Sequence, residues 1–205
     1  PVTDGYTRPL ATSVMNPVNK FKNWYDEEVE ISSVRIPSAC CLTSIGLDGY
    51  PNSRIVSLKE VVANSFVVTG PLNSRKGVEL LNNSKSSLTF WWTKTERQIR
   101  IQGDAVQIDN QLAERYFAER SLESQLVSKL SSQGSEIEDL SELKDIFEKK
   151  ISGSNNDKIE RPIEWAGFYI KPKRIEFMQF QENRFHIRKL YLLKNGSWNK
   201  KILQP

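Results

Sequence analysis

Basic side chains, small hydroxyls and a glutamine gather in one part of the sequence, residues 54–103. This part holds three polar clusters, at residues 54–59, 73–77 and 97–103. Each cluster lies on or beside an apolar segment that is typical of a strand or a short helix. Arginine and lysine can hold a phosphate, and a glutamine amide can hydrogen-bond a planar heterocycle. The pattern therefore predicts a site for an anionic ligand on a β framework.

The second cluster has the features of a phosphate-binding helix start. Ser74 is placed to cap a short helix that runs to Leu81, which puts Arg75 and Lys76 in its first turn. Free backbone N–H groups and two cations together suit a phosphate. Cations in a first turn oppose the helix dipole, so a nearby anion would help to explain them. From these residues alone, a solvated basic turn is the simpler interpretation.

A second candidate anion site lies further along the chain. Tyr116, Arg120 and Ser124 are spaced by four residues, so a continuous helix would align them on one face. A phenol, a guanidinium and a hydroxyl together can bind a phosphate or a carboxylate. An ordinary amphipathic surface is the more common meaning of such a spacing.

Composition narrows the class of protein. A chain of 205 residues with a net charge of +4 is most simply one domain, residues 1–205, with an ordinary core. Its aromatic residues lie in apolar runs and do not alternate with basic ones, so we expect no nucleic-acid partner. No apolar run approaches the roughly 20 residues of a membrane span, so we expect no membrane partner either.

Histidine and cysteine are scarce, which removes most zinc and hydrolase interpretations. His186 is the single histidine, and no paired metal-ligand motif is present, so we expect no metal site. Cys40 and Cys41 are adjacent, and a disulfide between neighbours requires a strained geometry. Two free thiols fit a reducing compartment, so we expect a cytoplasmic protein.

The elements that position these residues are mostly strands with short links, which predicts an antiparallel sheet or barrel with flanking helices, an α+β fold. Residues 1–15 show no clear period and are expected to form a mobile arm. Helices are expected from residue 17, at 74–81, at 110–120 and at 136–150, with a loop at 125–135. Strands are expected at 39–45, 53–59, 65–69, 86–92, 97–108, 165–170, 174–180, 185–193 and 198–203.

From about residue 16 to residue 205, the chain resembles the pyridoxamine 5'-phosphate oxidases, which are homodimeric flavoproteins with an FMN-binding split β-barrel. No single motif is decisive, and the resemblance rests on their joint order. The motifs are Arg54–Lys59, Ser74–Gly77, Phe90–Trp92, Arg97–Arg100, Tyr116-Phe117, Ser124-Gln125, Ile175–Phe177, Arg184–Arg188 and Leu203–Pro205.

The resemblance implies an FMN site shared by the two subunits of a homodimer. Arg75 and Lys76 would hold the FMN phosphate, and Gln98 would face the flavin ring. The family usually has tryptophan at the position of Met178, so one flavin-side contact is altered. The matched cofactor positions are Arg54, Lys59, Thr69, Arg75, Lys76, Gln98, Gln133, Met178 and Arg188.

The resemblance also implies a substrate and a reaction. The substrate phosphate would be held by Lys59, Tyr116, Arg120 and Ser124, while Arg184 and His186 would lie over the pyridine ring. Pyridoxamine or pyridoxine 5'-phosphate would be oxidised to pyridoxal 5'-phosphate, with O₂ as acceptor and H₂O₂ as product. We expect Arg184 to orient the substrate and stabilise charge, and His186 to accept or relay a proton.

Two other functions remain open from the sequence. One is a related flavin oxidase with another substrate, of the phenazine-biosynthesis type; the other is a non-catalytic binding protein for FMN or pyridoxal phosphate. The chain departs from the family pattern around the expected substrate lid and flavin edge. Besides Met178, the departures are Ser121, Lys129, Gly134 and Ile187.

Overall fold

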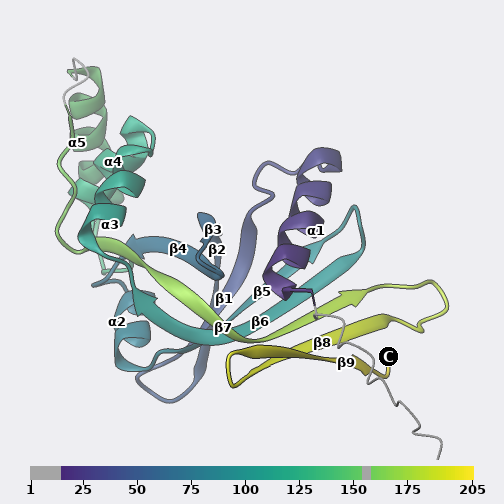
Figure 1. The fold of residues 1–205 in the computed structure, drawn as a ribbon. Coiled ribbons are helices and arrows are strands. Elements are labelled where there is room, and N and C mark those ends of the chain that lie inside the picture. Colours follow the sequence, from purple (N-terminus) through teal and green to yellow (C-terminus); the bar gives the residue numbers. More distant parts are fainter. Residues whose placement is uncertain (1–14, 154–157) are drawn as a thin grey trace, which may run out of the picture.

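The computed structural model describes residues 15–153 and 158–205 (Figure 1). The helices are α1 (Pro17–Ile31), α2 (Arg75–Asn82), α3 (Asn110–Ala118), α4 (Leu122–Leu130) and α5 (Leu140–Ser152). The strands are β1 (Ala39–Ile45), β2 (Pro51–Ser57), β3 (Glu60–Val62), β4 (Ser65–Pro71), β5 (Lys85–Trp92), β6 (Arg97–Gln107), β7 (Trp165–Gln179), β8 (Ile187–Lys194) and β9 (Ser197–Leu203).

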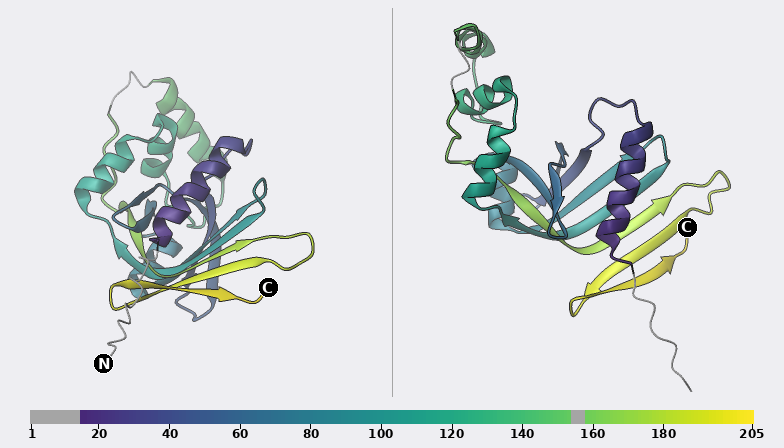
Figure 2. Two further views of the ribbon diagram at one scale, coloured as in Figure 1. Left: turned by 45° about the vertical axis from the view of Figure 1, so that its right-hand side comes forward. Right: turned by 45° about the horizontal axis from the view of Figure 1, so that its top comes forward.

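All nine of these strands belong to one antiparallel sheet, which confirms the predicted fold class. Their order is β2-β1-β5-β6-β7-β4-β3, and β8 pairs with both β7 and β9. The sheet curves into an open half-barrel, with α1 across its concave side and α3, α4 and α5 together at one end (Figures 1 and 2). Of the helices in the described part of the chain, none is long and apolar enough to cross a membrane.

Strand β7 joins the two halves of the sheet. Its first part pairs with β4 and its last part with β8, while β6 runs beside both. The prediction of two strands here was wrong, because Pro172 lies at a bulge and does not end the strand. The register of β6 shifts between Gln102 and Gly103, where a Cβ on Gly103 would lie 2.3 Å from the Lys171 carbonyl oxygen.

Helix α1 supplies one side of the main core. Asn16 caps it by accepting a hydrogen bond from the Val18 N–H, and Pro17 occupies the first helical position. Phe21 is fully buried, with its ring centroid 4.8 Å from Phe66 and 5.0 Å from Phe90. The predicted helix is therefore confirmed, and it packs on the core through Phe21.

The helical region after β6 differs from the prediction. The chain leaves the helix after Ala118, and Ser121 caps a new one by accepting from the Ser124 N–H. The expected loop at residues 125–135 is helical as far as Leu130, and the short strand β3 was missed. The predicted mobile arm lies outside the described residues except for Met15.

Candidate active site

A cleft of about 630 Å³ opens between the edge strand β2, the end of β4 and the start of α2. It brings together residues from five separate parts of the chain. Those that line it include six of the predicted cofactor and substrate residues: Arg54, Thr69, Arg75, Lys76, Arg120 and Gln133. A cleft with three arginines, a lysine and an amide in its wall suits a phosphorylated ligand.

The start of α2 has the predicted geometry of a phosphate-binding helix end. Ser74 caps the helix by accepting from the Gly77 N–H, and its own hydroxyl donates to the Pro71 carbonyl. A Cβ on Gly77 would lie 2.3 Å from the Leu72 carbonyl oxygen, so the helix start packs directly on the end of β4. The Lys76 ammonium donates to the Gln133 amide oxygen over 2.5 Å. This contact joins the α2 side of the cleft to the segment after α4.

One buried carboxylate that was not predicted, Glu79, organises two of the three arginines of the cleft. Its side chain is 1% exposed and accepts hydrogen bonds from Arg54 Nη2 at 2.8 Å and from Arg75 Nε at 2.9 Å. Ser44 and Asn52 also donate to it. Burial raises the pKa of Glu79, but these four hydrogen bonds outweigh burial and bring it to about 2. Its spacing of four from Arg75 on a helix was the one available signal.

The affinity of the apoprotein for FMN should fall as the pH rises. Burial, and next the positive charge of Arg54, lower the pKa of Lys76 from 10.5 to about 8. A phosphate is bound by the ammonium form, which is lost above this pKa. If only that form binds, affinity falls about eightfold between about pH 7.5 and about pH 9. Flavin-fluorescence titrations across this range measure the effect.

Lys76→Arg is the control for this pH dependence, because a guanidinium stays charged throughout the range. Its FMN affinity should be nearly flat with pH. An equally steep fall in the arginine variant would show that another group is titrating.

A group of charged and polar side chains beside the cleft contains Lys59 and Tyr116, two of the predicted substrate residues. Lys59 Nζ lies 2.7 Å from a Glu119 carboxylate oxygen and 5.2 Å from the centre of the Tyr116 ring. The Tyr116 hydroxyl donates to Glu60. Burial of the phenol and this hydrogen bond raise the pKa of Tyr116 to about 12, so it stays a donor. Neither carboxylate was predicted, although Glu60 and Glu119 each adjoin a predicted residue in sequence.

The other two predicted substrate residues lie on either side of the helix break. Arg120 Nη1 donates to the Ser128 hydroxyl at 2.6 Å, and its guanidinium lies 5.0 Å from the Trp165 ring centre. Ser124 is in the first turn of α4, with its hydroxyl 3.0 Å from that of Ser121. The predicted single helical face is therefore wrong, because the chain turns between Arg120 and Ser124.

A third group of predicted residues forms a row across the other half of the sheet. Gln98 on β6 pairs with Met178 on β7, which pairs with Arg188 on β8. Arg188 donates from Nε and Nη2 to one oxygen of Glu176, at 3.0 and 2.6 Å. Glu176 is 2% exposed. This carboxylate, which was noted only as part of a motif, fixes the guanidinium on the strand.

The two predicted catalytic residues lie in the turn between β7 and β8. Arg184 is exposed and has a φ of 65°, an uncommon left-handed conformation for a residue with a side chain. His186 is half-buried, and its Nδ1 accepts a hydrogen bond from the Gln181 N–H at 3.0 Å. The ring lies 4.5 Å from that of Phe180. Because Nδ1 is an acceptor, the neutral ring carries its proton on Nε2.

The row and the cleft lie at opposite ends of β7. Thr69, in the cleft, pairs with Gly167, and Gln98, in the row, pairs with Met178. The two β7 residues are 11 positions apart, which corresponds to roughly 35 Å along a strand. One small ligand therefore cannot contact both groups within one chain.

Two family patterns match the chain. The pattern described as pyridoxamine 5'-phosphate oxidase matches residues 30–151, and that described as the pyridoxine 5'-phosphate oxidase C-terminal dimerisation region matches residues 165–205. Relatives named pyridoxine/pyridoxamine 5'-phosphate oxidase include one from Herminiimonas arsenicoxydans, 34% identical over 93% of this chain and 90% of its own length. Another, from Wolbachia pipientis wMel, is 36% identical over 93% of this chain and 88% of its own length.

Solved structures also share this arrangement of strands. PhzG from Burkholderia lata 383, solved in complex with tetrahydrophenazine-1-carboxylic acid, has a TM-score of 0.87 and 26% identity, and the match covers 93% of each chain. A pyridoxamine 5'-phosphate oxidase-related, FMN binding protein from Nostoc punctiforme PCC 73102 has a TM-score of 0.78. At 16% identity, over 94% of this chain and 100% of the other, it supports the fold alone.

Proposed function

The chain belongs to the pyridoxamine 5'-phosphate oxidase family, and we propose that it oxidises pyridoxamine or pyridoxine 5'-phosphate to pyridoxal 5'-phosphate. The observation that carries this proposal is the cleft at the start of α2, which Arg54, Arg75, Lys76 and Gln133 line. FMN is the cofactor, and the fold is the family's split β-barrel.

The residues of the cleft fit an FMN phosphate. The free N–H groups at the start of α2 and the Lys76 ammonium supply donors. Glu79 holds the Arg54 and Arg75 side chains in place by accepting a hydrogen bond from each. The chemistry that FMN supplies when bound is acceptance of a hydride from the substrate, with O₂ as final acceptor and H₂O₂ as product. The protein's own contribution is to bind, orient and hold protons.

We assign the substrate phosphate to Lys59, Tyr116, Arg120 and Ser124, beside the cleft. His186 is expected to donate from Nε2 to the substrate in its neutral form, since the Gln181 N–H occupies Nδ1. This narrows the expectation that it accepts or relays a proton, because any exchange must pass through Nε2. Arg184 remains charged, so its role is orientation and charge stabilisation.

We also propose that each FMN is bound by two chains of a homodimer. Gln98, Met178 and Arg188 lie at the far end of β7 from the cleft, so those of a partner chain would complete the site. The C-terminal segment that matches a dimerisation region, residues 165–205, carries Met178 and Arg188. The free thiols Cys40 and Cys41 support a reducing, cytoplasmic environment.

The test is the visible spectrum of the purified protein, followed by peroxide and aldehyde release with each phosphorylated substrate in air. A flavin spectrum with both products supports the proposal. A second candidate is an oxidase with another, phenazine-like substrate, which the match to PhzG favours. Flavin without turnover of either pyridine phosphate, but with turnover of tetrahydrophenazine-1-carboxylic acid, would select the second candidate.

Replacing Arg184 with alanine should lower kcat about tenfold to thirtyfold while leaving flavin content nearly unchanged. The loss corresponds to one charge-assisted contact to the reacting part of the substrate. Steady-state kinetics and the flavin absorbance of the same sample give both values. Glu182→Ala is the control, because Glu182 is exposed in the same turn. Full activity in the arginine variant would remove its catalytic role.

A further inference from the structure

Two carboxylates pair with side chains that we assign to the substrate phosphate. Lys59 Nζ is 2.7 Å from Glu119 Oε2, and the Tyr116 hydroxyl donates to Glu60 Oε2. Both carboxylates are partly exposed, at 41% for Glu60 and 47% for Glu119. The phosphate site therefore already contains anionic partners that belong to the chain itself.

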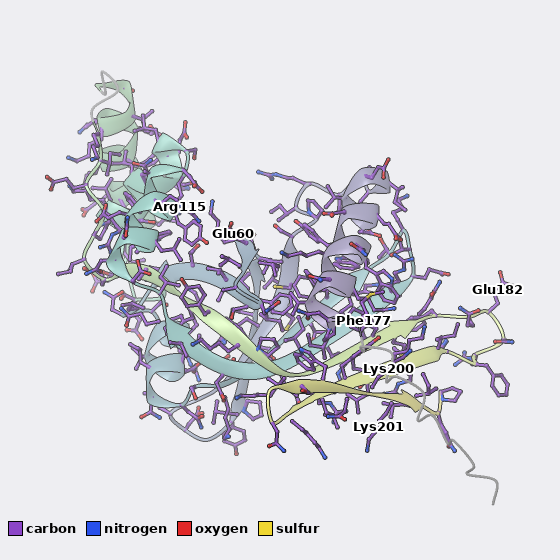
Figure 3. All side chains as sticks on the ribbon, viewed as in Figure 1. Glu60, Arg115, Phe177, Glu182, Lys200 and Lys201 are labelled. Carbon is purple, nitrogen blue, oxygen red and sulfur yellow. The ribbon has the colours of Figure 1, made fainter. Side chains whose placement is uncertain are left out.

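A further cation, Arg115, pairs with both carboxylates. Its Nη2 lies 2.7 Å from Glu60 Oε2 and its Nε lies 3.8 Å from Glu119 Oε1. Figure 3 shows Arg115 on α3 and Glu60 on β3 close together beside the open space in front of the sheet. Neither the predicted FMN site nor the predicted substrate site uses Arg115.

The charged side chains around this position determine how a phosphate can bind there. Lys59, Arg115 and Arg120 supply three positive charges, and Glu60 and Glu119 return two negative ones. The hydrogen bond from Lys59, and then its charge, lower the pKa of Glu119, so this carboxylate stays ionised. A phosphate dianion cannot share Lys59 and Tyr116 with two carboxylates without strong repulsion, so it must displace them.

We propose that Glu60 and Glu119 hold the phosphate-binding side chains in place before a phosphate binds, and that Arg115 retains both carboxylates when a phosphate displaces them. Arg115 is thus a positioning residue. This inference rests on the proposed function and deepens it. A ligand without a phosphate gains nothing from Lys59 or Tyr116, because both already have partners. A phosphate gains both contacts but must first displace the carboxylates, so they lower the affinity of the site for it.

The test measures binding of inorganic phosphate and of pyridoxal 5'-phosphate to the FMN-loaded protein by equilibrium titration. In the FMN-loaded protein the cofactor phosphate takes up Arg75 and Lys76, so the titration reports the substrate site. Glu60→Gln and Glu119→Gln should each lower the dissociation constant roughly threefold to tenfold. KM for the phosphorylated substrate should fall by a similar factor, with kcat changed less than about twofold. Binding of unphosphorylated pyridoxine should change less, because it carries no negative charge for the carboxylates to repel.

Arg115→Gln tests the second half of the proposal by a change in the opposite direction. It should raise the dissociation constant for phosphate about threefold, because the displaced carboxylates lose their alternative partner. The same change made together with Glu60→Gln and Glu119→Gln should have little effect. An equal effect in both backgrounds would show that Arg115 acts on the phosphate directly and would overturn its positioning role.

Glu114→Gln is the matched control, because it also removes one negative charge, but Glu114 lies on α3 and pairs with Arg161. It should leave phosphate binding unchanged. Glu119→Asp replaces the glutamine variant if that variant loses stability. It keeps the charge but shortens its reach toward Lys59, so its phosphate affinity should lie between those of the unaltered protein and the glutamine variant. Unchanged or weaker phosphate binding in both glutamate variants, with native flavin content, would overturn the inference. Absence of turnover in the unaltered protein would count against the proposed function alone, because the phosphate titrations do not depend on turnover.

Discussion

Replacing Arg75 and Lys76 together with alanine should weaken FMN binding by about a hundredfold to ten-thousandfold. Each side chain lines the cleft at the start of α2, and each would lose a charge-assisted hydrogen bond to the phosphate. The helix itself should persist, because its cap, Ser74, and the close packing of Gly77 on Leu72 are untouched. Titration of the apoprotein with FMN, followed by flavin fluorescence, measures the change.

The adjacent basic pair Lys149 and Lys150 on α5 provides the control for this experiment. Both side chains are exposed and neither lines the cleft. Their replacement with alanine removes the same charge and should leave FMN affinity within about twofold. Unchanged affinity in the Arg75 and Lys76 variant would instead contradict the assignment of the phosphate position.

Replacing Glu79 with alanine should lower the free energy of unfolding by about 2–4 kcal/mol. The carboxylate is almost fully buried, and its loss leaves Arg54, Ser44 and Asn52 without their common acceptor. Breaking a buried pair from one side is costly, although the partial exposure of Arg54 reduces the loss. Denaturant unfolding monitored by tryptophan fluorescence measures it, with exposed Glu148→Ala as the control. A loss below about 0.5 kcal/mol would contradict the proposed role.

The lowered pKa of the same carboxylate predicts that its contribution to the free energy of unfolding decreases in acid. The pKa of Glu79 is lowered from 4.5 to about 2 in the folded protein. Its stabilising effect is therefore fully present above about pH 4.5 and is lost as the pH falls toward about 2. The stability difference between the unaltered protein and Glu79→Gln should shrink across this range.

The sequence was most informative where local signals agree. Ser74, Arg75 and Lys76 were correctly placed because a cap and a short helix are encoded within a few residues. The antiparallel sheet followed from alternating strands with turn residues between them. The break after Ala118 was missed because the capping role of Ser121 competes with a periodic pattern that continues through it.

The parts of the site that were not predicted depend on contacts between residues that lie far apart in the sequence. Glu79 joins Ser44 and Asn52, which lie 35 and 27 positions away along the chain. Glu60 reaches Tyr116 across 56 positions, and Lys76 reaches Gln133 across 57. Nothing in the local pattern indicates which strand edge lies against which helix, so these partners follow only from the three-dimensional fold.

The long strand β7 also limits where the chain can change its length during evolution. One added or lost residue between Gly167 and Met178 would turn every later side chain of the strand to the opposite face and misplace the row relative to the cleft. By contrast, α5 contains no buried residue, and it belongs to the excursion between β6 and β7. Insertions and deletions should therefore accumulate around α5, while the spacing within β7 stays fixed.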